Sequence, residues 1–244
     1  MTRRHHRRAS PSVVALLHSP LLAPLVWEAV AELLNAQGRT VVVPDLNLVT
    51  PTDPPYLPRL ASAAADAIDS AGRDAPAVLV GHSMAGMLIP AVMEELSRPV
   101  IGAVLVDSHL PTPGASWWDN APPQLARQLQ DLAVVGRLPP WHQWFPDDVV
   151  AGMLPDLRLA RRFLAQLQPV PLALFKEPFP GRPSWADETT CAYVLLSGPY
   201  REVARQAADR GWLVTQLDEH HLAMLTEPDA VAATLQALLA DMDL

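Results

Sequence analysis

The sequence contains one cysteine, Cys191, and one lysine, Lys176. A single cysteine cannot form an intrachain disulfide, so the fold does not depend on an oxidising compartment. We expect Cys191 to be a small buried residue without a catalytic role. The 18 Lys and Arg residues are outnumbered by 26 Asp and Glu, which gives a formal net charge of -8. Nucleic-acid binding needs Lys and Arg clustered on one face, so no nucleic-acid partner is expected.

Long hydrophobic runs are also missing. No apolar run reaches the roughly 18 residues that a membrane span requires. The N-terminal stretch MTRRHHRRAS is basic, but the apolar run after it is interrupted by His18 and has no small-residue cleavage site. We therefore expect residues 1–11 to be a disordered basic arm rather than an export signal, and the protein to be cytoplasmic with no membrane partner.

The chain is long enough, at 244 residues with 50% hydrophobic residues, to bury one large core. Short apolar runs alternate with segments of helical apolar spacing, which predicts a mostly parallel six-stranded sheet covered by helices on both faces. The expected strands are 12–17, 40–45, 77–81, 101–107, 191–197 and 212–218, and the expected helices are 25–38, 57–72, 84–96, 200–210 and 229–241. The core is thus assigned to residues 12–107 and 191–244.

The interval 108–190 breaks this alternation and is rich in proline and tryptophan. Helix-like pieces at 122–135 and 156–167 predict a helical cap inserted after the fourth strand. Ligands of parallel sheets bind at the carboxyl edge of the strands, so the cap is expected to cover an apolar pocket there. The alternative for any single ring is that it packs a cap helix onto the sheet. The tryptophans expected to line the pocket are Trp117, Trp118, Trp141 and Trp144.

The stretch AVLVGHSMAG, residues 77–86, places Ser83 between a predicted strand and a predicted helix. A serine at such a sharp turn, with small residues around it, is typical of a nucleophile elbow that exposes the hydroxyl at the helix start. The backbone N–H of Met84 and the positive helix end would face negative charge that develops beside Ser83. His82 is expected to line the same site. The alternative is a small polar residue in a structural turn.

These motifs resemble the α/β-hydrolase superfamily over nearly the full length, from LLHSPLLAPLVW through VVVPDL, VLVGHSMAG and GAVLVD to HHLAMLTEPDAVAATL. The resemblance is greatest to the small branch of esterases, thioesterase-like proteins and plant hydroxynitrile lyases. It implies an α/β-hydrolase fold that needs no metal or cofactor. It also implies that His221 is the base that activates Ser83. The preceding His220 is expected to be a solvated or supporting ring.

This chain lacks an acidic residue at the position where the family usually carries its catalytic acid. After the strand 191–197 the family commonly carries an aspartate where SGPYRE has Arg201, with Glu202 one position late. Some members supply the carboxylate after the strand that follows the nucleophile helix, which here is Asp107. We favour Asp107 as the acid over Glu202 or no acid, because a group must hold the imidazole tautomer if the serine acts through it.

The loop after the first predicted strand, which supplies an oxyanion donor in this family, also differs from the family pattern. The family has a His-Gly pair followed by a second backbone donor, whereas this chain reads His18-Ser19-Pro20. Pro20 has no N–H, and losing one such donor typically costs about 3 kcal/mol of transition-state stabilisation. The Ser19 hydroxyl sits where hydroxynitrile lyases carry a substrate-contacting threonine, so it either donates to the substrate or is an ordinary turn serine.

The leading hypothesis is a serine hydrolase that acts on an ester, thioester or lactone with an apolar body. A second hypothesis uses Ser83 and His221 as an acid/base pair in a lyase, epimerase or cyclase reaction without an acyl-enzyme. A third is a non-catalytic protein whose pocket holds a hydrophobic ligand. The expected partner is a small apolar molecule, and the sequence does not indicate an oligomeric state.

Overall fold

The computed structural model describes residues 12–47, 53–71 and 75–244. The predicted basic arm, residues 1–11, lies outside the described residues. No helix in the described ranges is long and apolar enough to cross a membrane.

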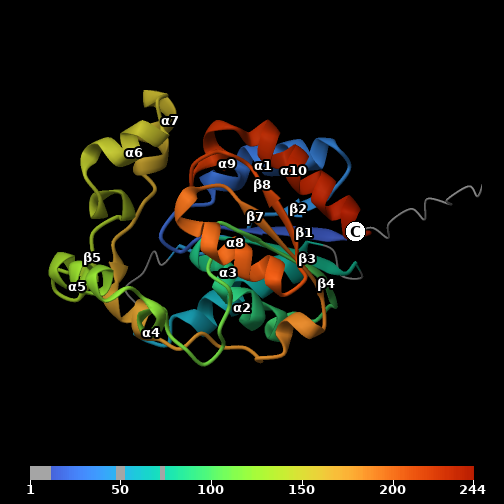
Figure 1. Ribbon diagram of the computed structural model, residues 1–244, viewed down its shortest axis with the longest axis horizontal. Coiled ribbons are helices and arrows are strands. Elements are labelled where there is room, and N and C mark those ends of the chain that lie inside the picture. Colours follow the sequence, from blue (N-terminus) through green and yellow to red (C-terminus); the bar gives the residue numbers. More distant parts are fainter. Residues whose placement is uncertain (1–11, 48–52, 72–74) are drawn as a thin grey trace, which may run out of the picture.

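A six-stranded, wholly parallel sheet forms the centre of the protein (Figure 1). The prediction of a mostly parallel six-stranded sheet is therefore confirmed. Its strand order is β2-β1-β3-β4-β7-β8. The strands are β1 (Val13–Leu17), β2 (Thr40–Val42), β3 (Ala77–His82), β4 (Val100–Val106), β7 (Thr190–Leu195) and β8 (Leu213–Gln216).

Helices cover both faces of the sheet, because apolar side chains of the central strands point alternately to either side. Val13, Ala15 and Leu17 of β1 belong to one core cluster, with residues of α2 (Leu57–Ser70), α3 (Met84–Glu95) and α8 (Arg201–Asp209). Val14 and Leu16 belong to the other, with residues of α1 (Leu25–Ala36), α9 (Ala223–Thr226) and α10 (Pro228–Asp241). Figure 1 shows these two helix layers on opposite sides of the strands.

The chain between β4 and β7 forms a separate group of short elements, most of which lie to one side of the sheet in Figure 1. The predicted helices 122–135 and 156–167 are present but shorter. The first ends at Leu132 because the chain turns back at Val135 and Gly136, both with positive φ. The elements are α4 (Trp117–Asn120), α5 (Pro123–Leu132), β5 (Arg137–Leu138), η1 (Trp141–Trp144), α6 (Asp147–Met153), α7 (Leu157–Leu164), β6 (Val170–Pro171), η2 (Leu172–Lys176) and η3 (Trp185–Asp187).

A carboxylate fastens this inserted segment to the core. Glu177 accepts hydrogen bonds of 2.8 Å from the backbone N–H groups of Tyr56 and Leu57 at the start of α2. The first N–H groups of a helix have no partner within the helix, and they carry its positive dipole end, so an anion is stabilised there. Phe163 of α7, which is fully buried, joins the core cluster on the α1 side of the sheet.

Candidate functional site

Ser83 occupies a strained turn between β3 and α3. Its φ is 56° and its ψ is -130°, a backbone conformation that non-glycine residues rarely adopt. The turn is held by a hydrogen bond of 3.0 Å from Ser83 N–H to the Val106 carbonyl on β4. A Cβ on Gly81 would lie 2.6 Å from the Gly86 Cα, and a Cβ on Gly86 would overlap the Ser108 side chain. Both glycines are therefore required for strand and helix to approach this closely.

The amino-terminal end of α3 lies directly beside this serine. Met84 is the first residue of the helix, so its N–H has no acceptor within the helix. The aligned peptide dipoles place partial positive charge at the same point. The turn therefore offers a backbone donor where an oxyanion could form next to Ser83.

The imidazole of His221 meets the carboxylate of Asp107. The distance from His221 Nδ1 to Asp107 Oδ2 is 3.1 Å, although 114 residues separate them in the chain. The Asp107 side chain is fully buried, and the His221 side chain is 12% exposed. A carboxylate on Nδ1 favours the tautomer with the proton on that atom, which leaves Nε2 free to accept a proton.

Three further donors surround the Asp107 carboxylate. Oδ1 accepts the backbone N–H groups of Leu196 at 2.7 Å and Ser197 at 3.1 Å, and the Ser197 hydroxyl donates to Oδ2 at 2.5 Å. Asp107 itself has a positive φ of 41°. The buried Tyr193 hydroxyl donates to the carbonyl of the next residue, Ser108, at 2.8 Å and so fixes this bend. The loop after β7 thus orients the carboxylate through its own N–H groups.

Two other histidines support the backbone around His221. The buried His82 donates from Nε2 to the His221 carbonyl at 3.0 Å, and their ring centroids are 4.5 Å apart. Burial holds the pKa of His82 well below its usual value, and the nearby His221 lowers it further. The ring is therefore neutral at pH 7. His220 Nδ1 accepts the Leu222 N–H at 3.2 Å, which makes it a supporting ring at the start of α9.

The loop after β1 is fixed by His18, which donates from Nδ1 to the Ser19 carbonyl at 2.8 Å and accepts the Leu46 N–H at 2.9 Å on Nε2. Ser19 is fully buried, and its Oγ accepts the Leu21 N–H at 3.3 Å. Pro20, which lies between Ser19 and Leu21 in the chain, has no backbone N–H. The geometry of Ser19 is that of a serine that closes a turn.

The four tryptophans predicted to line a pocket divide into two groups. The Trp141 ring lies 6.1 Å from the His221 ring and 5.2 Å from the Phe145 ring, centroid to centroid. The other three gather around the end of η2 instead. Trp117 and Trp144 pack on Phe175 at 5.1 Å and 5.7 Å, and Trp118 lies 6.1 Å from Trp117 and 5.1 Å from the Lys176 ammonium.

The sequence stretch SGPYRE supplies an unpredicted member of the site, Tyr200. Its ring is stacked on the His221 ring, with an interplanar angle of 6° and centroids 5.3 Å apart. Glu202, the alternative acid, is exposed on α8 and pairs with Arg205 at 2.5 Å. The sequence signal for Tyr200 is an aromatic residue in the loop where the family commonly carries its acid.

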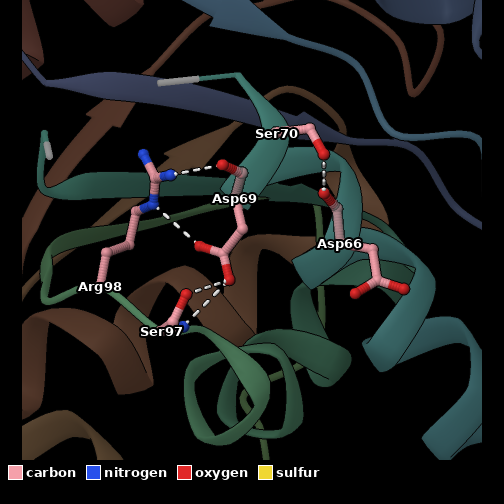
Figure 2. Close-up of a pocket in the computed structure, with 5 residues that line it drawn as sticks. All are labelled: Asp66, Asp69, Ser70, Ser97 and Arg98. Atoms are coloured by element: carbon pink, nitrogen blue, oxygen red, sulfur yellow. Dashed lines mark hydrogen bonds and ion pairs between the residues drawn. The ribbon is translucent and has the colours of Figure 1, made fainter. Parts of the chain in front are cut away.

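A surface pocket of about 510 Å³ lies far from these residues, at the amino-terminal edge of the sheet. Figure 2 shows the Arg98 guanidinium directed at Asp69, whose carboxylate also accepts from Ser97. These bonds join the end of α2 to the start of β4. Ligands of parallel sheets bind at the opposite, carboxyl edge, so this pocket is a structural ion-pair site. Its lining residues are Asp66, Asp69, Ser70, Ser97 and Arg98.

Parallel strands flanked by two helix layers, with a serine at a strand-to-helix elbow, define an α/β-hydrolase fold. The model of the Alpha/beta hydrolase family matches residues 14–234, and the chain belongs to this family. A search of curated protein sequences finds no significant match.

Solved structures with the same fold cover almost the whole chain. An extracellular α/β-hydrolase from a Paenibacillus species, described as sharing structural and functional homology with tobacco Salicylic Acid Binding Protein 2, has a TM-score of 0.76 and 20% identity over 93% of this chain and 99% of its own. A pyrethroid hydrolase from Sphingobium faniae has a TM-score of 0.68 and 19% identity over 94% and 97%. A variant of tomato Methylketone Synthase I, complexed with beta-ketoheptanoate, has a TM-score of 0.69 and 15% identity over 95% and 98%. Identities this low establish the fold alone.

Proposed function

We propose that the protein is a serine hydrolase that cleaves an ester, thioester or lactone with an apolar body, using Ser83, His221 and Asp107. The observation that supports this most strongly is the 3.1 Å contact between His221 Nδ1 and Asp107 Oδ2. It joins a buried, fully hydrogen-bonded carboxylate to a histidine whose carbonyl accepts a hydrogen bond from His82, the residue before the elbow serine. A serine hydroxyl is a weak nucleophile until a neighbouring imidazole takes its proton.

The proposed reaction has two halves. Ser83 Oγ attacks the substrate carbonyl carbon while His221 Nε2 accepts the hydroxyl proton, and Asp107 stabilises the imidazolium that forms. His221 then gives this proton to the leaving alcohol, thiol or ring oxygen, which completes an acyl-enzyme on Ser83. Water, activated by the same imidazole, hydrolyses the acyl-enzyme and restores Ser83.

Oxyanion stabilisation in this proposal depends on the N–H of Met84 at the start of α3. The loop after β1 cannot supply a donor at Pro20, and one donor is typically worth about 3 kcal/mol in the transition state. Ser19 Oγ accepts from Leu21, so its own proton is formally available, but the residue is fully buried. We therefore assign the main electrostatic role to Met84 N–H and expect a slower acyl transfer than in a site with two backbone donors.

The apolar character of the substrate is inferred from the residues around the imidazole. Trp141, which packs on Phe145, and Tyr200 both lie next to the His221 ring. Aromatic rings next to the reacting groups favour an apolar acyl or alcohol portion over a charged one. The name of the pyrethroid hydrolase with the same fold is compatible with this class. No metal or cofactor has a role in the proposed steps, and a cytoplasmic location stays a prediction.

Labelling with a fluorophosphonate tests the proposal directly, because such probes phosphonylate only an activated serine. We expect intact-protein mass spectrometry to show one adduct, and peptide mapping to place it on Ser83. Ser83→Ala and His221→Ala should both abolish the adduct, while Ser70→Ala, which removes an exposed hydroxyl at the opposite edge of the sheet, should retain it. A folded wild-type protein that stays unlabelled would contradict the proposal.

A second candidate function is proton transfer without an acyl-enzyme, as in a lyase reaction. The missing backbone donor at Pro20 favours it, because such a reaction does not require an oxyanion hole shaped for acyl transfer. A methylketone synthase shares the fold. Turnover that survives Ser83→Ala but disappears in His221→Ala would identify this function, whereas loss in both variants supports the hydrolase.

A further inference from the structure

Tyr200 contacts both residues of the proposed proton-transfer pair. It ends the short turn η4 (Gly198–Tyr200) between β7 and α8. Its ring is nearly parallel to the His221 ring, and the His109 ring packs against it at 5.6 Å. The Ser83 side chain lies close enough to its hydroxyl to lower the pKa of the phenol. One side chain therefore lies next to both the elbow serine and the imidazole.

The phenol keeps its proton at neutral pH. Burial and, to a lesser extent, the negative charge of Asp107 raise the pKa of Tyr200 to about 12, although the nearby Ser83 side chain acts in the opposite direction. A neutral phenol can donate or accept a hydrogen bond but cannot serve as a base at pH 7. His221 thus remains the acceptor of the Ser83 proton.

The sheet order decides from which side Tyr200 approaches the serine. Ser83 follows β3, whose neighbours in the sheet are β1 on one side and β4, then β7, on the other. The loop with Ser19 and Pro20 follows β1, while Tyr200 follows β7. Tyr200 therefore reaches Ser83 from the side opposite to Pro20. Its hydroxyl is not placed to replace the missing N–H of Pro20, and it lies instead on the side of the imidazole.

We infer that Tyr200 is a positioning residue for the Ser83–His221 pair, whose ring fixes the plane of the imidazole and whose hydroxyl fixes the Ser83 side chain. This inference rests on the proposed function. The face of the phenol ring also stabilises His221 when it becomes positively charged, as cations are attracted to the electron-rich face of aromatic rings. In the proposed step the proton moves from Ser83 Oγ to His221 Nε2, and Tyr200 neither gains nor loses one.

Two substitutions separate the hydroxyl from the ring. Tyr200→Phe keeps the stack and removes the hydroxyl next to Ser83, so the second-order rate of fluorophosphonate labelling should fall about fivefold to tenfold, as expected for the loss of one polar contact. Tyr200→Leu also removes the stack, so labelling should slow further. The additional loss should be recovered in Tyr200→Phe, which restores an aromatic ring of the same shape.

The matched control is Arg201→Ala, which changes the next residue, exposed at the start of α8, and should label at the wild-type rate. Thermal unfolding of each variant reports any loss of fold. Wild-type protein that is not labelled overturns the proposed function and the inference with it. Wild-type protein that labels normally, with both Tyr200 variants within twofold of it, overturns the inference alone. Equal slowing in both variants does so too, because it would show that the ring stacked on His221 contributes nothing.

Discussion

Replacing Asp107 by Asn tests whether this carboxylate controls the tautomer of His221. Asn preserves the size of the side chain and tolerates the positive φ of 41° at this position. The backbone therefore need not rearrange. What changes is the hydrogen bonding, because the amide has one oxygen that accepts and one nitrogen that donates.

The neighbouring donors determine how the new amide is oriented. Asp107 Oδ1 accepts the backbone N–H groups of Leu196 and Ser197, so the Asn oxygen must occupy this position. The flipped orientation would leave two buried N–H groups facing an NH₂ group, at a cost of at least about 2 kcal/mol, or a factor of about 30. The Asn nitrogen is then directed at His221 Nδ1, where Asp107 Oδ2 lies at 3.1 Å.

A donor opposite Nδ1 places the imidazole proton on Nε2, where it blocks the transfer from Ser83. We therefore expect Asp107→Asn to lower kcat by about three to four orders of magnitude, the loss typical of a wrong tautomer. The assay is the hydrolysis of p-nitrophenyl esters of increasing chain length, together with the rate of fluorophosphonate labelling. Circular dichroism and thermal unfolding should show an intact fold.

The matched control is Glu202→Gln, which removes the other candidate acid. Glu202 is exposed and paired with Arg205, so its loss should leave kcat unchanged. A folded Asp107→Asn variant with activity within tenfold of the wild type would refute the tautomer argument. Loss of activity in Glu202→Gln instead would identify Glu202 on α8 as the acid.

Three further predictions concern stability and the oxyanion loop. Burial lowers the pKa of His82 in the folded protein, so below pH 6.5 the unfolded chain takes up more protons at this residue than the folded one. The urea unfolding free energy should therefore fall with decreasing pH by up to about 1.4 kcal/mol per pH unit from this group. His82→Gln should make that fall shallower. Val135 is 96% exposed and has a φ of 48° in a two-residue turn with Gly136, where Asn is preferred. Val135→Asn should therefore raise the free energy of unfolding by about 1 kcal/mol, whereas Val134→Asn, which lies outside the positive-φ positions, should change it by less than about 0.5 kcal/mol. Equal effects of the two substitutions would exclude the turn as the cause. Ser19→Ala should lower the free energy of unfolding by about 1 kcal/mol, because the hydrogen bond from Leu21 N–H is lost, and should change kcat less than threefold. A hundredfold drop in kcat would instead identify Ser19 as an oxyanion donor.

The central sheet could be predicted because its strands carry their signal locally. Residues 13–17 are apolar and completely buried, as expected for a strand covered on both faces. The predicted ends of strands and helices were wrong where a single residue overrides the apolar spacing. The predicted strand 40–45 ends at Val42, shortly before Pro44, which has no N–H to donate to a neighbouring strand. Helix α5 stops at Leu132, before the turn at Val135 that its apolar spacing does not reveal.

The cap could be predicted in composition but not in arrangement. Its aromatic content indicated rings near the site, yet only Trp141 among the four named tryptophans has a ring contact with His221. Elements of four residues, such as α4 and η1, are too short for periodicity to define a buried face. Which ring faces the imidazole and which packs on Phe175 is set by tertiary contacts between distant segments.

The position of the acid explains why the loop after β7 is built as it is. With Asp107 at the end of β4, the loop after β7 contributes N–H groups and the Ser197 hydroxyl to that carboxylate. A second carboxylate in this loop, at the family's usual position, would place two like charges beside one imidazole and raise the pKa of one of them. A neutral phenol carries no such penalty. Because the acid follows β4, the loop after β7 can present the neutral Tyr200 to His221 without the repulsion that an aspartate there would cause.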